Sequence, residues 1–298
     1  MNKKGKEMKV NKKMINYVLA TVIVSAMTAC GGGGGDSSSG IYIPEDSDGD
    51  GFYDDIDPAP HDASNPGDFS SPQAIINNPK VKEALKQAKE HGLDIKPSLG
   101  KKPPKLTGYY RREESGGRVV ATQTGVDIGR SWVGREYRVQ TEGKHYLDYH
   151  VFFTDGEYLS VGYEVGAILK GDGNSFTIYS PSRFGCFEKD GGNYSTPVIK
   201  IISGTRDVES GDLINRRYLN VKVGTATGTY TAACDARLPG GAVNKWTVSR
   251  HAPLRKVEVD ELRYMCVDGD KAYVVKEIWK NKDKESCRCT KDIEIECS

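Results

Sequence analysis

One segment, residues 146–165, constrains the fold more than any other part of the chain. It reads YLDYHVFFTDGEYLSVGYEV. Asp155-Gly156 is a strong signal for a two-residue β-turn, so Thr154 is expected to pair with Glu157 in an antiparallel hairpin. Counting outward from that pair predicts the rest of the register: Phe153 with Tyr158, Phe152 with Leu159, His150 with Val161, Tyr149 with Gly162 and Asp148 with Tyr163.

Apolar side chains fall on both faces of this predicted hairpin. Leu147, Tyr149 and Phe153 share one face, and Phe152 and Leu159 lie on the other. A sheet with one face in water shows a cleaner alternation of apolar and polar residues. The hairpin is therefore either sandwiched between two layers or part of a barrel with an apolar interior, and a barrel of about eight to ten strands can hold one small ligand.

The region 106–298 has the composition of a β protein. It holds all three tryptophans, every tyrosine except Tyr17, Tyr42 and Tyr53, and many Val, Ile, Thr and Gly residues. We predict an all-β domain here, an antiparallel β-barrel or β-sandwich of about 10–12 strands with disulfides. The expected strands are 107–112, 118–123, 132–140, 146–154, 157–165, 175–179, 198–203, 218–223, 228–233, 245–250, 261–267 and 272–279.

Six of the seven cysteines lie in this β domain. An even number of cysteines in an exported chain indicates disulfides, and zinc binding is the alternative. Cys287 and Cys289, if extended, have Cα atoms roughly 6.5–7 Å apart, at the edge of bridging range, so we expect separate partners for them. The candidates are Cys186, Cys234, Cys266, Cys287, Cys289 and Cys297.

The first 29 residues have the pattern of an export signal. Six lysines precede an apolar run from Tyr17 to Ala29, which at 13 residues is too short for a spanning helix but suits a signal peptide. Met27-Thr28-Ala29-Cys30 resembles the lipobox of bacterial lipoproteins. The resemblance implies cleavage after residue 29, acylation of Cys30 and a lipid anchor in the cell envelope, and Gly31 in place of aspartate implies the outer membrane. The alternative is an ordinary secretory signal with an incidental cysteine.

Residues 30–40 form a Gly/Ser tether, and residues 41–70 form an acidic segment that contains a candidate calcium loop. Alternate aspartates, a carbonyl at position 7 and Gly51 at the sharp turn match a 12-residue loop, and hard calcium prefers such oxygen ligands. The loop resembles a thrombospondin type-3 repeat, which implies a calcium-stiffened stalk; a disordered acidic spacer is the alternative. The expected ligands are Asp46, Asp48, Asp50, Phe52, Asp54 and Asp57.

Residues 71–105 are expected to contain one short helix and a Pro/Lys linker. Asn78 can cap the helix, Pro79 suits its first turn and Gly92 can end it. Val81, Ala84, Leu85 and Ala88 lie on one face, which we expect to dock on the β domain, with partner binding as the alternative. The linker, residues 96–105, is expected to be solvated.

Chemistry-bearing motifs are sparse. With 42 Lys and Arg against 41 Asp and Glu, the chain is not a basic nucleic-acid binder, and we expect no nucleic-acid partner. Asp148 and His150 point to the same side of one strand as a candidate acid/base pair, and His251 ends another strand. Such pairs are more often structural, and the aromatic residues more often fill a core than stack on sugars.

We therefore expect a non-enzymatic, lipid-anchored module that presents the β domain to an unknown ligand or envelope protein. The alternative is an exported hydrolase with a site assembled from dispersed strand-end residues. Clustering of Asp148, His150 and His251 in one cleft would favour the enzyme. An apolar cavity or an exposed Tyr/Trp patch would favour binding.

Overall fold

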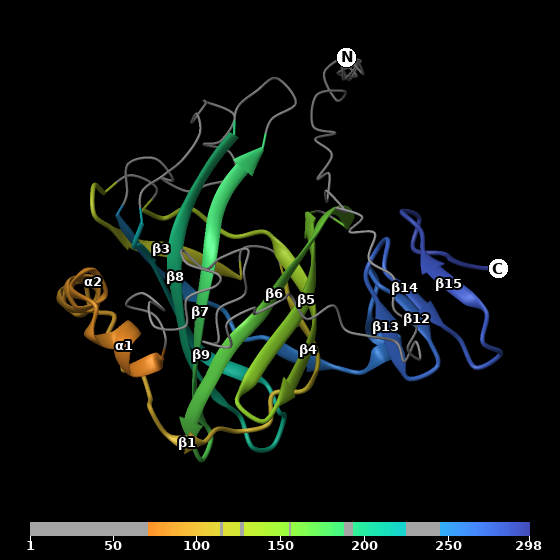
Figure 1. Cartoon of the computed structure of the whole chain (residues 1–298), viewed down its shortest axis with the longest axis horizontal. Coiled ribbons are helices and arrows are strands. Elements are labelled where there is room, and N and C mark those ends of the chain that lie inside the picture. Colours follow the sequence, from red (N-terminus) through yellow and green to blue (C-terminus); the bar gives the residue numbers. More distant parts are fainter. Residues whose placement is uncertain (1–70, 114–115, 126–127, 155, 188–192, 225–244) are drawn as a thin grey trace, which may run out of the picture.

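The structure is a computed structural model, and it describes residues 71–113, 116–125, 128–154, 156–187, 193–224 and 245–298. The signal peptide, tether and acidic segment predicted for residues 1–70 lie outside these ranges. Strands dominate the described part of the chain, so the all-β prediction is confirmed (Figure 1).

One large sheet makes up most of the fold. Its strands are β1 (Lys101–Lys102), β2 (Gly108–Arg112), β3 (Gly117–Thr122), β4 (Gly134–Glu142), β5 (His145–Thr154), β6 (Glu157–Asp172), β7 (Ser175–Phe187), β8 (Asn193–Arg206), β9 (Leu213–Lys222), β10 (Trp246–His251) and β11 (Arg255–Val257). They follow the order β11-β2-β4-β5-β6-β7-β8-β9-β10-β3, all antiparallel, and β1 adds to β6 in parallel. The predicted strand 228–233 lies outside the described residues.

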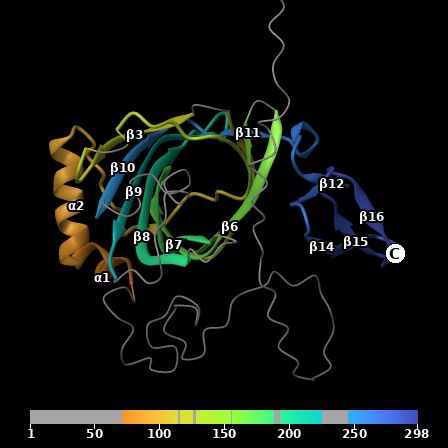
Figure 2. The same ribbon diagram turned by 90° about the horizontal axis from the view of Figure 1, so that it is seen from above.

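The sheet closes into a barrel because its first strands pair with its last ones. In the wall β2 and β3 follow one another along the same neighbour, which consists of β10 and β11. β3 pairs with β10, with Gly117 opposite His251, while β2 pairs with β11, with Arg111 opposite Arg255. When β2 and β3 are counted as one strand of the wall, and β10 and β11 as another, the ten strands of the described path form an eight-stranded barrel (10 − 2). Figure 2 looks into the resulting ring, so of the two expected architectures the register selects the barrel.

Two helices cover one side of the barrel wall (Figure 2). The predicted helix is α2 (Pro79–Glu90). The Asn78 side chain accepts hydrogen bonds from the backbone N–H groups of Lys80 and Val81, and Gly92 follows the helix with φ +77°. A shorter helix that the sequence did not predict, α1 (Pro72–Asn77), precedes it. The predicted apolar face docks on the outer surface of β7 to β10, with Val81, Ala84 and Ala88 fully buried and Leu85 partly buried.

The chain between the helices and β2 is part of the fold. The Ser98 backbone N–H donates to Thr177, and Tyr179 donates to the Ser98 carbonyl. The lysines at 101, 102 and 105 remain exposed, as expected of a solvated linker. Leu106 is fully buried among apolar side chains of the barrel interior, so this segment fills one end of the barrel.

The last residues form a small module on the opposite side of the barrel from the helices (Figures 1 and 2). It begins with a 3₁₀ turn, Val259–Glu261, and its short strands are β12 (Cys266–Asp268), β13 (Lys271–Tyr273), β14 (Ile278–Lys280), β15 (Ser286–Cys289) and β16 (Ile295–Cys297). The prediction of two longer strands, 261–267 and 272–279, was wrong. The backbone turns at Lys276, where φ is +72°, and the 3₁₀ turn occupies the start of the first segment.

The hairpin predicted for residues 146–165 forms, but its register differs from the predicted one. Thr154 pairs with Glu157 and Phe153 with Tyr158, as predicted. Beyond them the prediction was wrong, because the register shifts after Phe153: Phe152 lies opposite Ser160, which leaves Leu159 as an extra residue in a bulge. The corrected pairs are His150 with Gly162, Tyr149 with Tyr163 and Asp148 with Glu164.

The structure explains why both faces of this hairpin carry apolar side chains. One face points into the barrel. The other carries Tyr149, Val151 and Val161, which pack against the C-terminal module. Strands β4 and β5 are therefore covered on both sides, although the interior itself is apolar only in part.

Candidate functional site

The barrel interior divides into an apolar half and a polar half. Tyr110, Tyr137, Tyr146, Ile178 and Ile202 belong to one buried apolar cluster around Leu106. Because side chains alternate along a strand, the residue two positions away in the same strand also faces inward. In these antiparallel strands the next layer lies two positions later in β2, β5 and β7 and two positions earlier in β4 and β8. Those positions are polar in every case: Arg112, Arg135, Asp148, Ser180 and Lys200.

The first part of the polar half is the arginine group: Arg112, Arg135, Arg216 and His251, from β2, β4, β9 and β10. Arg112 Nη1 lies 2.6 Å from His251 Nδ1, and its Nη2 donates to the Val133 carbonyl at 2.9 Å. The guanidinium of Arg135 lies 4.1 Å from the ring centre of Phe152. Among the described residues, no carboxylate forms an ion pair with any of these three arginines.

The uncompensated positive charge affects its neighbours. Burial, together with the nearby Arg135 and Arg216, lowers the pKa of Arg112 to about 10. Burial alone would raise the pKa of the Tyr137 phenol, but the same three arginines outweigh it and hold that pKa below its usual value. Three like charges around a buried phenol give this part of the interior a positive potential.

The contact with Arg112 fixes the protonation of His251. A guanidinium can only donate, so His251 Nδ1 accepts, and the proton of the neutral ring is on Nε2. Burial and the surrounding arginines lower the pKa of His251 well below its usual value, which keeps the ring neutral. Tyr218 stacks on the ring with centres 4.5 Å apart, and Trp132 lies 5.8 Å away. His251 therefore presents a fixed N–H donor.

The second part is the carboxylate group on β5 and β6, Asp148 and Glu164, and both carboxylates accept hydrogen bonds. Asp148 accepts a hydrogen bond from Tyr146 at 2.9 Å and contacts His150 Nδ1 at 2.5 Å. Burial opposes ionisation of Asp148, but these partners outweigh it and lower its pKa. Glu164 accepts from Ser180 and, at 2.8 Å, from Lys200.

Gly162 makes room for the His150 ring. A Cβ at position 162 would lie 2.5 Å from His150 Nε2. The bulge at Leu159 brings this glycine opposite His150, where the predicted register would have placed Val161. The bulge therefore allows the Asp148–His150 contact inside the barrel.

Several polar atoms of the interior are buried and have no hydrogen-bond partner among the described residues. Five are N–H donors, and Ser249 Oγ and Thr196 Oγ1 can donate or accept. Asn220 Oδ1, on the same face of β9 as Tyr218, is an acceptor. The five donors are Arg112 Nε, Trp132 Nε1, Arg135 Nε, Arg216 Nη1 and His251 Nε2. Such atoms are rare in native proteins, and each costs about 1–3 kcal/mol when left unpaired. An occupant rich in acceptors would satisfy them.

The residues predicted from the sequence divide into two sets. Cys30 and the calcium-loop residues Asp46, Asp48, Asp50, Phe52, Asp54 and Asp57 lie outside the described residues. Asp148 and His150 do share one side of their strand and are in contact. His251, which had no recognisable partner in the sequence, lies in the same interior and contacts Arg112 and Tyr218.

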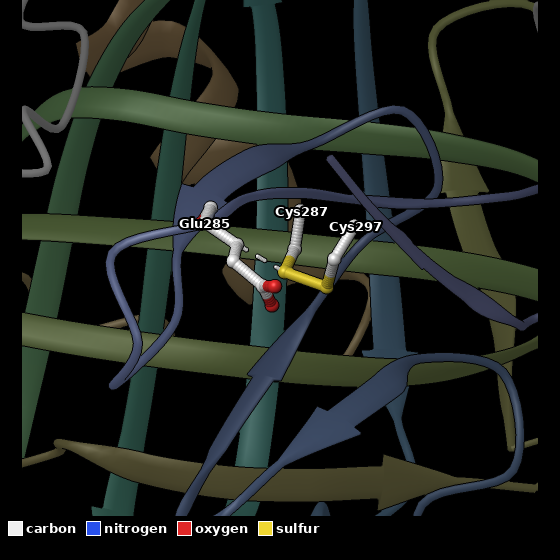
Figure 3. A group of neighbouring side chains, drawn as sticks. All are labelled: Glu285, Cys287 and Cys297. Atoms are coloured by element: carbon white, nitrogen blue, oxygen red, sulfur yellow. Dashed lines mark hydrogen bonds between the residues drawn. A yellow bond between two sulfur atoms is a disulfide. The ribbon is translucent and has the colours of Figure 1, made fainter.

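Four of the six candidate cysteines form disulfides, Cys266–Cys289 and Cys287–Cys297. Cys287 and Cys289 thus have separate partners. Cys234 lies outside the described residues, as does the side chain of Cys186. Figure 3 shows the Glu285 carboxylate beside the Cys287–Cys297 bond, with potential metal-ligand atoms within 4.8 Å of one another. The sulfurs are bonded to each other, so they are not the thiolates that a metal requires.

The three interior arginines were not predicted as site residues from the sequence. Arg112 and Arg135 lie in predicted strands, and Arg216 lies just before one. The sequence does contain one signal for them, because each arginine lies two residues from a tyrosine that faces the core. These tyrosines are Tyr110, Tyr137 and Tyr218. Alternation alone does not say that an inward-facing arginine lacks a carboxylate partner, because that depends on which strands adjoin.

Comparisons with family models, curated proteins and solved structures gave no match for this chain. Among the described residues, no helix has the length and apolar character needed to cross a membrane.

Proposed function

We propose that this chain is a lipid-anchored protein of the bacterial cell envelope whose β-barrel binds a small ligand in its interior. Cys30 carries the lipid, which holds the protein at the outer membrane. A calcium-binding stalk formed by the loop from Asp46 to Asp57 separates the anchor from the barrel. The protein binds its ligand without transforming it.

The set of buried, unpaired donors in the barrel interior carries this proposal. A barrel that evolved only for stability would fill its interior with apolar side chains, as this one does around Leu106. The other half instead holds Arg112, Arg216 and His251, all at least nine-tenths buried, each with a donor atom that has no described partner. Buried polar groups that destabilise the empty protein are typical of binding sites, where the ligand supplies the missing hydrogen-bond partners.

The residues that support the envelope location are independent of this site. The charged leader, the apolar run and Cys30 have the order of a lipoprotein signal. The disulfides of the C-terminal module agree with an oxidising compartment outside the cytoplasm.

A hydrolase is the second candidate, and the Asp148–His150 contact is the observation in its favour. A carboxylate that orients a histidine is the arrangement of a general base. Asp148 is the described hydrogen-bond partner of His150, and no described nucleophile hydrogen-bonds to the ring. The pair also lies beside Tyr146 in the barrel interior, where Asp148 accepts a hydrogen bond from the buried tyrosine hydroxyl. We therefore favour a structural role for it.

Two measurements test the proposal. In the first, cell fractionation compares the wild-type chain with Cys30→Ser; the wild type is expected in the membrane fraction and the variant in the soluble fraction. An equal distribution of both would overturn the lipid anchor.

In the second, the mature protein is extracted in non-ionic detergent and its mass is measured under native and then denaturing conditions. We expect an added mass that is lost on denaturation. The released compound is then incubated with fresh wild-type protein and with His150→Ala. Recovery of the compound unchanged from both supports binding, conversion by the wild type alone would establish the hydrolase, and the absence of any added mass would contradict an internal ligand.

A further inference from the structure

We infer that the ligand of the barrel interior carries a small oxyanion, such as a phosphate, sulfate or carboxylate group, held among Arg112, Arg216 and His251. This inference rests on the proposed ligand-binding function and specifies the chemistry of that same site. Three observations support it: the excess of donors, the excess of positive charge and the positions of the donors on adjoining strands.

The donors come from neighbouring positions on the wall. Tyr218 stacks on His251 and lies opposite Ser249 in the β9–β10 ladder. Arg216 lies two residues before Tyr218 on β9, and Arg112 contacts His251 directly. One occupant could therefore accept from several of them. An oxyanion offers several acceptor lone pairs on one compact group, which is why arginines so often recognise phosphate and carboxylate.

The charge balance of the interior favours an anion over a neutral acceptor. Among the described residues Glu164 pairs with Lys200, and the three arginines of the group lie near the carboxylate Asp148, which leaves an excess of +2 around them (3 − 1) with neutral histidines. Asp148 offsets only part of the arginine charge, and Glu164 is already paired with Lys200. Bound water could satisfy individual N–H groups, but it would not offset like charges in a low-dielectric interior.

Arg216 gives the sharpest test because its neighbour in the sequence is a matched control. Arg216 points into the barrel and has a buried, unpaired Nη1. Arg217 points outward, where it donates to the Asp94 carbonyl. Replacing each by methionine removes one positive charge and leaves a chain of similar length. Only Arg216→Met removes it from the site.

The experiment measures melting temperature and binding heat for wild type, Arg216→Met and Arg217→Met. Each protein is first unfolded in urea with its disulfides intact, separated from any released ligand and refolded. The probes are inorganic phosphate and sulfate, compared with sodium chloride at equal ionic strength and with glycerol as a neutral solute. We expect both oxyanions to raise the melting temperature of the wild type and of Arg217→Met. Because charge-assisted hydrogen bonds are lost, Arg216→Met should bind about 10- to 100-fold more weakly.

The melting temperature without anion provides the second readout. An unpaired buried arginine destabilises the empty barrel, so Arg216→Met should melt at or above the wild-type temperature. If Arg216 were merely structural, the variant would melt lower. A lower melting temperature, or equal oxyanion shifts in the two variants, overturns the inference.

The outcomes also separate this inference from the function on which it rests. In one outcome, Arg216→Met still carries the added mass under native conditions, and phosphate and sulfate affect neither the wild type nor the variants. The barrel would then bind a ligand, but not through an oxyanion at this position. Absence of both the added mass and the oxyanion effect would remove the proposed function itself.

Discussion

Replacing Glu136 by alanine should release the C-terminal module from the barrel and destabilise the whole chain. Glu136 is fully buried on the outer face of β4. Its carboxylate accepts from Arg111 Nε at 3.0 Å and Nη2 at 2.5 Å, and from the backbone N–H groups of Arg263 and Tyr264 at 3.0 and 2.9 Å. It therefore holds one buried arginine and the start of the module together.

The expected loss of unfolding free energy follows from the buried groups that would lose Glu136 as their partner. Removing one partner of a buried ion pair costs about 3–5 kcal/mol, because the remaining charge is uncompensated. The two freed backbone N–H groups add to this cost wherever the module stays closed. A loss of that size is a large fraction of the roughly 5–15 kcal/mol by which a folded domain is stable.

The matched control is Glu296→Ala, which removes a carboxylate that pairs with Arg288 at the surface. Both partners are more than half exposed, so that pair should contribute about 0–1 kcal/mol. Urea titration followed by tryptophan fluorescence gives the unfolding free energies, and limited proteolysis reports release of the module. If Glu136→Ala lost no more free energy than Glu296→Ala, the account of the module's attachment would be wrong.

Three further predictions concern other parts of the molecule. Replacing Asp46 and Asp48 by alanine should abolish calcium binding in calorimetry and leave the barrel's melting temperature unchanged; undiminished calcium heat would refute the loop assignment. Burial lowers the pKa of His150 below 6.5 and that of His251 well below it, so on acidification the unfolded chain gains these protons before the folded chain does. The unfolding free energy should therefore fall below about pH 6.5, by up to about 1.4 kcal/mol per pH unit for each histidine, and less steeply in His251→Asn. Urea titrations from pH 7.5 to pH 5 check this, and a rise in stability on acidification would contradict it. Gly162→Ala should cost about 1–3 kcal/mol in the same urea assay, because the new Cβ would meet His150 Nε2 at 2.5 Å. Adding His150→Ala should recover much of that loss, and a purely additive double variant would exclude the clash.

The sequence predicted the elements whose signals are local. Asn78, Pro79 and Gly92 delimit α2, and the apolar face of that helix docks where its periodicity indicated. Asp155-Gly156 predicted the first pairs of the hairpin. In each case a few adjacent residues contain the whole signal, because capping, turn geometry and periodicity act within one or two turns of the chain.

The remaining features depend on contacts between distant segments. The bulge at Leu159 is invisible to a count of alternating residues, and it moves Gly162 opposite His150. Closure of the barrel depends on pairs such as Gly117 with His251, far apart in the sequence. For the same reason the arginine group was missed, since its members come from four strands and become a group only when the barrel closes.

A crystal of the mature chain grown with selenate tests the central claim most directly, because this tetrahedral oxyanion can be located by the anomalous scattering of selenium. We predict an anomalous peak inside the barrel, with selenate oxygens within about 2.7–3.2 Å of Arg216 Nη1 and His251 Nε2. Peaks confined to the outer surface, with the interior donors bound only to water, would contradict an internal oxyanion site.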